Sequence, residues 1–138
     1  MEAVELEERV GIGGDADVVV ARQRARELAN ELELSSTDQT LLATAISEVA
    51  RNITTYARRG EVSVSIVEDG RGRRGIRVVA SDQGPGIADV ERAMQDGYTT
   101  GGGLGLGLPG ARRLVDDFVL DSEPGRGTTV TLVKWSRT

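Results

Sequence analysis

The chain has 138 residues and a formal net charge of −5, and only 3% of its residues are aromatic. An acidic protein with few aromatic side chains lacks both the positive field and the stacking surfaces that nucleic-acid binding uses. The sequence contains no cysteine and no histidine. Disulfides, thiolate catalysis, histidine-dependent triads and autophosphorylation on a histidine of this chain are therefore excluded.

Length and hydropathy favour a single domain that covers residues 1–138. Apolar residues make up 38% of the chain, which is enough for a hydrophobic core. The N-terminal residues are acidic and lack the apolar region of a signal peptide. The longest aliphatic stretch, residues 18–21, is far too short to span a membrane. We expect a cytoplasmic protein with no membrane partner and no nucleic-acid partner.

The first half of the chain predicts one strand and two helices. Apolar residues alternate within 4–10, which favours a first strand at a sheet edge. Helical spacing over residues 18–32 follows, with Asp15 as a candidate cap. A second helix begins at Ser36, where Ser36 and Gln39 fit an S-x-x-Q capping box, and it runs to about residue 57.

The second half predicts a β-rich arrangement. Alternating or β-branched runs at 62–66 and 76–80 flank an arginine- and glycine-rich connection, residues 69–75, which fits a solvated hairpin loop better than an anion site. Short helices are expected at 89–95 and 108–116, and a closing strand pair at 118–122 and 128–135. Phe118 and Trp135 are expected in the core. Together these elements predict an α/β (α+β) two-layer sandwich, with a mixed β-sheet and helices packed on one face.

Glu48 and Asn52 are the first candidate functional pair. They lie four residues apart on the second predicted helix and therefore share a face. An asparagine oxygen is a suitable ligand for Mg²⁺, which takes its other ligands from water and substrate phosphates. A glutamate one turn earlier can accept a proton from an attacking hydroxyl. An exposed polar pair on an amphipathic helix is the alternative interpretation.

A second candidate is the turn that follows the predicted strand 76–80, in which Asp82 is followed by Gly84 and Gly86. A carboxylate only accepts hydrogen bonds, and adenine offers an amino donor. Glycines let the backbone approach a planar ring without an intervening Cβ. An ordinary turn after a strand is equally compatible with these residues.

The strongest local signal is a glycine run that leads directly into a predicted helix. Backbone N–H groups of such a loop, with a helix N-terminus behind them, form a site for polyphosphate. The run has no Gly-Lys-Ser/Thr and no strand directly before it, so it is neither a Walker loop nor a dinucleotide fingerprint. The alternative is a structural linker. The candidate phosphate-binding residues are Gly101, Gly102, Gly103, Leu104, Gly105 and Gly107.

A final motif, Gly125-Arg-Gly-Thr128, is only a hairpin turn when it is considered alone. In their order along residues 10–135, however, the four motifs resemble those of the GHKL ATP-binding superfamily, which includes gyrase and the histidine kinases. The resemblance implies a Bergerat ATP-binding fold that uses ATP with Mg²⁺. By the same resemblance, Asn52 would hold Mg²⁺, Asp82 would bind the adenine amino group, and Thr128 would lie near the adenine.

Within this superfamily, residues 44–53 and 96–110 are similar to the small serine/threonine kinases of bacterial partner-switching pathways. From the size of the chain we expect no counterpart of the transducer domains of gyrase, and a histidine kinase would need a histidine. The resemblance implies phosphorylation of a STAS-domain antagonist protein, with Glu48 as general base, and binding and activation of a PP2C-type phosphatase. Two alternatives stay open: an anti-sigma factor kinase that sequesters a sigma factor, and a nucleotide-gated binding module without catalysis.

Two features depart from the expected pattern. Leu106 stands in the glycine run where these kinases usually carry alanine. The chain has a single lysine, Lys134, and it is remote from the motifs, so Mg²⁺, backbone amides and an arginine that the sequence does not single out are expected to compensate phosphate charge. Arg51 is next to the site in sequence, but its side chain is expected to point elsewhere.

Overall fold

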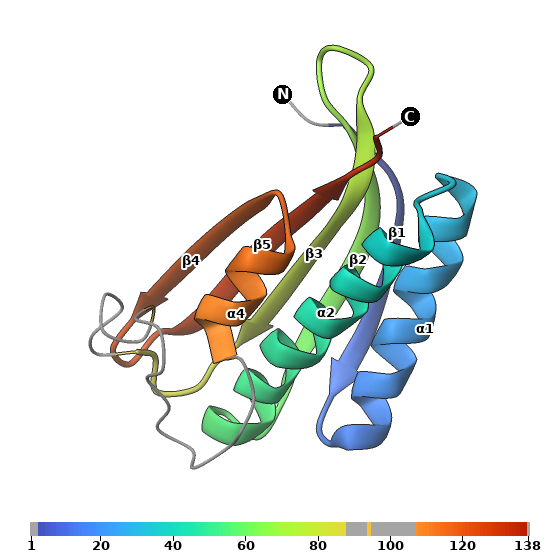
Figure 1. The fold of residues 1–138 in the computed structure, drawn as a ribbon. Coiled ribbons are helices and arrows are strands. Elements are labelled where there is room, and N and C mark those ends of the chain that lie inside the picture. The colour runs from blue at the N-terminus through green and yellow to red at the C-terminus, as the bar shows by residue number, and fades with distance from the viewer. Residues whose placement is uncertain (1–2, 88–93, 95–106, 138) are drawn as a thin grey trace.

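The computed structural model describes residues 3–87, 94 and 107–137. Five strands form one sheet in the order β1-β2-β3-β5-β4, and the three helices of the described residues cover one of its faces (Figure 1). The two-layer α/β sandwich predicted from the sequence is therefore confirmed. In chain order the elements are β1 Ala3–Ile12, α1 Asp15–Glu31, α2 Ser36–Tyr56, β2 Gly60–Glu68, β3 Arg74–Asp82, α4 Gly107–Leu114, β4 Asp117–Glu123 and β5 Gly127–Trp135.

The expectation of a mixed sheet is wrong, because all four strand pairings are antiparallel. Strands β3 and β4 do run in the same direction, as a strand–helix–strand connection through α4 requires. They do not pair, however, because β5 lies between them and pairs with both. The predicted helix at 89–95 lies outside the described residues.

Both predicted helix caps are one position away from the observed ones, although α2 begins at Ser36 as predicted. The residue before α1 is Gly14, which makes no side-chain cap, so Asp15 is the first helical residue and not the cap. Ser35 caps α2 by accepting a hydrogen bond from the Asp38 backbone N–H at 3.1 Å. Gln39 instead donates to the Leu34 carbonyl, so the predicted Ser36/Gln39 capping box does not form. Ser35 and Ser36 are adjacent, and the sequence alone could not choose between them.

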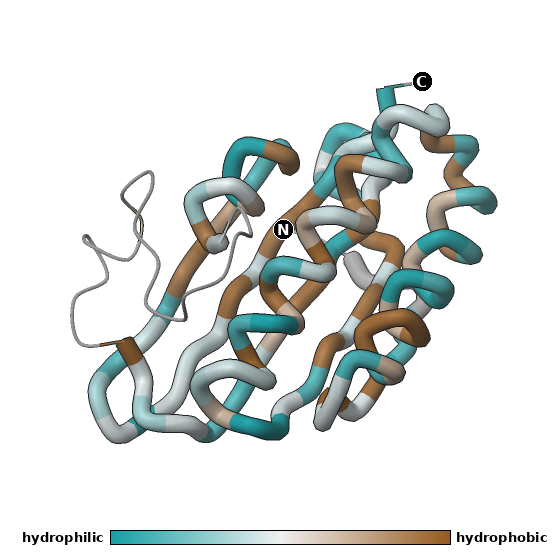
Figure 2. Tube along the Cα trace, turned by 60° about the horizontal axis from the view of Figure 1, so that its bottom comes forward, coloured by the Kyte–Doolittle hydropathy of each residue, from teal (hydrophilic) through white to brown (hydrophobic). Residues whose placement is uncertain are grey.

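The hydrophobic core lies between the helices and one face of the sheet. Apolar stretches alternate with polar ones along the strands and helices (Figure 2), as expected for elements that bury one side only. Burying each large aliphatic side chain contributes roughly 1.5–3 kcal/mol. The largest fully buried side chains of this core include Ile12, Leu42, Ile46, Ile53, Ile66, Ile76 and Leu132.

A smaller cluster of Val67, Val133 and Trp135 covers part of the opposite sheet face. Gly75 makes room for it, because a Cβ at Gly75 would lie 2.8 Å from Cε3 of Trp135. Trp135 is thus a buried anchor as predicted, although not in the main core, whereas Phe118 packs against the main core.

The guanidinium of Arg73, in the β2–β3 loop, lies 4.2 Å from the centre of the Trp135 ring and bonds Asp69 at 2.8 Å. Desolvation alone would raise the pKa of the Asp69 carboxyl, but hydrogen bonds from the Arg71 and Arg73 backbone and from the Arg73 side chain lower it below its usual value. Arg73 is therefore engaged within the loop, which fits the expected hairpin connection better than an anion site.

Lys134, the only lysine, is 4% exposed and is held by two carboxylates and one backbone carbonyl. Its Nζ lies 3.6 Å from Asp38 Oδ1 at the start of α2 and 3.9 Å from Asp116 Oδ1 just after α4. It also donates to the Leu114 carbonyl at 3.3 Å. Arg137 pairs with the same two carboxylates. Lys134 therefore joins α2, α4 and β5 and has a structural role.

Within the described part of the chain, no helix is both long and apolar enough to pass through a membrane.

The Lys134 cluster yields a stability prediction. Lys134→Met should lower the free energy of unfolding by on the order of 3 kcal/mol, because it leaves the buried Asp38 carboxylate without its nearest buried counter-charge. Urea unfolding measures this change. Arg9→Gln is the control, since it breaks an exposed ion pair with Glu7 and should cost less than about 1 kcal/mol. Equal losses in the two variants would contradict the structural role of Lys134.

Candidate functional site

The predicted site begins with Asp82, the last residue of β3, whose side chain is buried. Its Oδ1 accepts a hydrogen bond from the Gly84 backbone N–H at 2.9 Å, which fixes the turn after the strand. In the sheet, Asp82 lies between Gly60 of β2 and Thr128 of β5. Strand pairing therefore brings Thr128, 46 positions later in the sequence, beside the carboxylate.

The glycines around Asp82 allow close approaches between protein segments. A Cβ at Gly84 would lie 2.6 Å from the Cβ of Ala57 at the end of α2, and one at Gly86 would meet the Glu123 carbonyl. Gly86 also has φ +77, in the left-handed region. The sequence analysis assigned these glycines to ring approach. The structure gives a different reason, because the missing side chains leave room for α2 and for the β4–β5 turn.

Thr128 is buried and bonds a residue that the sequence analysis missed, Ser122 of β4. The two hydroxyl oxygens lie 2.8 Å apart, and Ser122 Oγ also accepts from the Ile87 backbone N–H at 2.8 Å. Ser122 thus ties the turn after Asp82 to the β4–β5 hairpin. No local motif marks this serine, since only the pairing of Ser122 with Thr128 places it here.

Glu48 lies at the other side of the site, on α2, and is 9% exposed. Its Oε2 accepts a hydrogen bond from the Gly107 backbone N–H at 2.9 Å, across 59 positions of sequence. Gly107 is the first residue of α4, with φ +65. The candidate general base is therefore in direct contact with the helix start that follows the glycine run. In Figure 1 the start of α4 lies beside α2.

The expectation that Arg51 points away from the site is wrong. Arg51 is one helical turn after Glu48, and its Nη1 lies 3.6 Å from Glu48 Oε1. The two oxygens of the Glu48 carboxylate thus face two different donors, a helix-terminal N–H and a guanidinium. An i,i+3 spacing allows such side chains to meet on one face of a helix, but the spacing does not determine the side-chain orientation that brings them together.

Asn52 is half-buried one turn after Glu48, and its side chain makes no hydrogen bond to other residues that the structure describes. None of the residues that the structure describes therefore competes for its amide oxygen. Nowhere in the described residues do three acidic side chains gather into a metal cluster. This donor set fits Mg²⁺, which takes few protein ligands and fills its shell with water and phosphate oxygens.

The remaining predicted residues, Gly101, Gly102, Gly103, Leu104 and Gly105, lie outside the described residues, as does Leu106. Of the glycine run, the structure describes only Gly107. The described candidates fall into two groups: Glu48, Asn52 and Gly107 around α2 and α4, and Asp82, Gly84, Gly86 and Thr128 at the end of the sheet. The groups meet where Gly84 contacts the end of α2.

Comparison with known proteins identifies the family. The model for histidine kinase-, DNA gyrase B-, and HSP90-like ATPases matches residues 37–137. The serine/threonine-protein kinase RsbT of Bacillus subtilis is 50% identical over 121 residues, which are 88% of this chain and 90% of that protein. The anti-sigma F factor of Geobacillus stearothermophilus is 31% identical over 122 residues, or 83% of this chain and 81% of that protein.

A solved structure of the RsbU and RsbW domains of a Mycobacterium tuberculosis protein shares the fold, with a TM-score of 0.66 and 22% identity. The similarity covers 96% of this chain, which spans 33% of that longer chain. At this identity the likeness bears on the fold alone.

The chain belongs to the histidine kinase-, DNA gyrase B-, and HSP90-like ATPase family, and ATP is the nucleotide that this family uses. Within the family, its close similarity to RsbT supports protein-serine/threonine kinase activity. The predicted superfamily and enzyme class are thereby confirmed.

The glycines of the β4–β5 turn provide a matched test of the site. Gly125 and Gly127 both have left-handed φ values, +81 and +85, but a Cβ at Gly125 meets open space whereas one at Gly127 would meet the Asp82 carbonyl. Both alanine variants should lose roughly 1–2 kcal/mol of stability to backbone strain. Only Gly127→Ala should also weaken ATP binding, by about tenfold, because it displaces Asp82. Calorimetric ATP titration measures the difference, and equal ATP affinities would contradict the role of Asp82.

Proposed function

We propose that this protein uses Mg-ATP to phosphorylate a serine or threonine of a STAS-domain antagonist and that, once released, it binds and activates a PP2C-type phosphatase. The observation that carries the catalytic part is the contact of Glu48 with Gly107. It sets a carboxylate at the helix start where the glycine run ends. A helix start favours a phosphate group, because its N-terminal N–H groups and its dipole attract an anion.

This placement supports the following reaction. Glu48 takes the proton of the acceptor hydroxyl, the hydroxyl oxygen forms a bond to the terminal phosphorus of ATP, and the bond to the bridging oxygen of ADP breaks. Asp82 would bind the adenine amino group, with Thr128 beside Asp82 in the sheet. Asn52 would supply a protein oxygen to Mg²⁺, and the metal would neutralise phosphate charge.

Radiolabelled ATP tests the kinase part. With a STAS-domain acceptor and Mg²⁺, wild-type protein should transfer label from the terminal phosphate, and Glu48→Ala should lose at least about 100-fold in rate because it lacks the base. Its ATP affinity should persist. Transfer by Glu48→Ala at the wild-type rate would remove Glu48 from this role.

Asn52→Ala separates metal binding from proton transfer. This variant should bind ATP no better with Mg²⁺ than without it, while its unfolding midpoint stays near wild type because Asn52 is only half-buried. Retention of the Mg²⁺ dependence would show that Asn52 is not the metal ligand.

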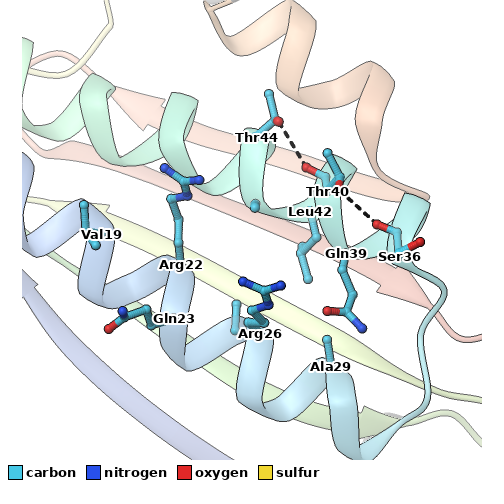
Figure 3. Close-up of a pocket in the computed structure, with 12 residues that line it drawn as sticks. Val19, Arg22, Gln23, Arg26, Ala29, Ser36, Gln39, Thr40, Leu42 and Thr44 are labelled. Atoms are coloured by element: carbon cyan, nitrogen blue, oxygen red, sulfur yellow. Dashed lines mark hydrogen bonds between the residues drawn. The ribbon is translucent and has the colours of Figure 1, made fainter.

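The proposal also requires a surface for a regulatory protein, and a groove of about 430 Å³ between α1 and α2 fits this need. Figure 3 shows Arg22 and Arg26 of α1 alongside Thr40 and Thr44 of α2. None of the twelve residues that line the groove is acidic, although the protein as a whole is. Val19, which is 50% exposed, adds apolar area at the edge. The groove therefore suits an acidic segment of a partner with one apolar side.

Charge reversal tests this surface. The double variant Arg22→Glu and Arg26→Glu should lower affinity for the STAS-domain antagonist by about tenfold or more, since an attraction becomes a repulsion. ATP affinity should not change, because neither residue touches the site. Arg71→Glu, at the exposed tip of the β2–β3 loop, is the control for reversing an arginine outside the groove. Equal binding by the double variant and the control would contradict partner docking in the groove.

The second candidate is an anti-sigma factor kinase, which the similarity to anti-sigma F factors favours. The ATP site would be the same and only the partner would differ. Pull-down of purified sigma factor in competition with the N-terminal domain of a PP2C-type phosphatase separates the two proposals. Preferential capture of sigma factor would overturn the phosphatase assignment.

A further inference from the structure

The Glu48 carboxylate is held between two groups that are themselves suited to bind an anion. On one side the Gly107 N–H donates to Oε2 at 2.9 Å, and on the other the Arg51 guanidinium lies 3.6 Å from Oε1. Glu48 is 9% exposed, whereas the Arg51 side chain is 60% exposed. The guanidinium carries five N–H donors, and one contact to Glu48 leaves several of them available to another anion.

Transfer of a terminal phosphate needs positive charge besides Mg²⁺, and kinases commonly supply it with a lysine. The one lysine of this chain cannot do so. Lys134 is buried against Asp38, Asp116 and the Leu114 carbonyl. Those contacts lie at the C-terminal end of β5, whereas Thr128 and the site lie at its N-terminal end. Because the chain has no histidine, arginine is the only type of cationic side chain left to supply such charge.

Arg51 is placed to supply this positive charge. It lies between the candidate base and the candidate metal ligand, three residues after Glu48 and one before Asn52. Its ion pair with Glu48 places the guanidinium at the same carboxylate as the N–H of Gly107. A phosphate at the start of α4 would therefore be within reach of both donors.

We propose that Arg51 is a catalytic residue that donates to the terminal phosphate of ATP and that Glu48 occupies its guanidinium when no phosphate is bound. The inference rests on the proposed kinase function. As the acceptor oxygen bonds to phosphorus and the bond to ADP breaks, Arg51 holds the equatorial oxygens of the transferred group. Glu48, released from the guanidinium, takes the hydroxyl proton.

A surface ion pair without a function provides the matched control. Arg24 pairs with Glu27 on α1 at 3.5 Å, also with i,i+3 spacing and with exposed side chains. Such pairs contribute little to stability. If Arg51 and Glu48 were an ordinary pair of this kind, Arg51→Gln and Arg24→Gln would behave alike in every assay of nucleotide binding and transfer.

The experiment compares ATP and ADP affinities by calorimetry for wild type, Arg51→Gln, Arg51→Lys and Arg24→Gln. Loss of one charged donor to the terminal phosphate should weaken ATP binding by about tenfold and leave ADP binding unchanged. The transfer rate should fall by about 100-fold or more, with the KM for the acceptor unchanged. Arg51→Lys should recover part of the rate, because it restores the charge without the planar fork.

A second variant tests the competition by Glu48. Glu48→Gln removes the negative charge that attracts the Arg51 guanidinium and the Gly107 N–H. This variant should therefore bind ATP at least as tightly as wild type. It should transfer little phosphate, because it lacks the base. Equal weakening of ATP and ADP in Arg51→Gln, or unchanged ATP affinity and rate, would overturn the role of Arg51. If wild type transferred phosphate to none of the acceptors tested, the kinase proposal would be refuted instead. The difference between the ATP and ADP affinities of Arg51→Gln would still decide whether Arg51 contacts the terminal phosphate.

Discussion

Strand β5 pairs with β3 on one side and with β4 on the other, so the chain between β3 and β4 must cross the sheet instead of turning back at its end. Two consequences build the site. Asp82 at the end of β3 gains Thr128 as a neighbour, and Thr128 gains Ser122 from β4. The crossover carries α4 on the helix-bearing face, with its first residue against Glu48 of α2 (Figure 1). Strand order therefore brings together residues from five separate elements: β3, β4, β5, α2 and α4.

Close backbone approach maintains this arrangement at the sheet end. Three glycines lie where a Cβ would collide with another segment: Gly84 against α2, Gly86 against the β4–β5 turn, and Gly127 against Asp82. A side chain at any of them would force the backbone of the turn to move, because the groups that it would meet are helix or main-chain atoms. The position of the Asp82 carboxylate thus depends on missing side chains as much as on its own hydrogen bond to Gly84.

Two cationic side chains, Lys134 and Arg51, have different roles. Lys134 is buried and neutralises carboxylates that join α2, α4 and β5, so its charge stabilises the fold. Arg51 is largely exposed and paired with only one carboxylate in the described structure, so its charge is available to a ligand. Burial separates these roles, since a charge surrounded by protein partners cannot turn to a phosphate without leaving those partners unpaired.

The sequence by itself determined the elements and the class of site. Hydrophobic periods of two and of about 3.6 place the strands and helices, and Glu48, Asn52, Asp82 and the glycine motifs predict a nucleotide site by their order. The hydrophobic periodicity could not determine which strands pair. It reports which side of a strand is buried, not which strand lies beside it.

Only the tertiary structure decided three further points. The sheet is antiparallel throughout because β5 separates β3 from β4. Ser122 joins the site through its pairing with Thr128, and Arg51 turns toward Glu48. The first two depend on strand pairing and the third on the orientation of a side chain. Local sequence patterns therefore predicted some residues of the site, and packing between segments far apart in sequence determined the others.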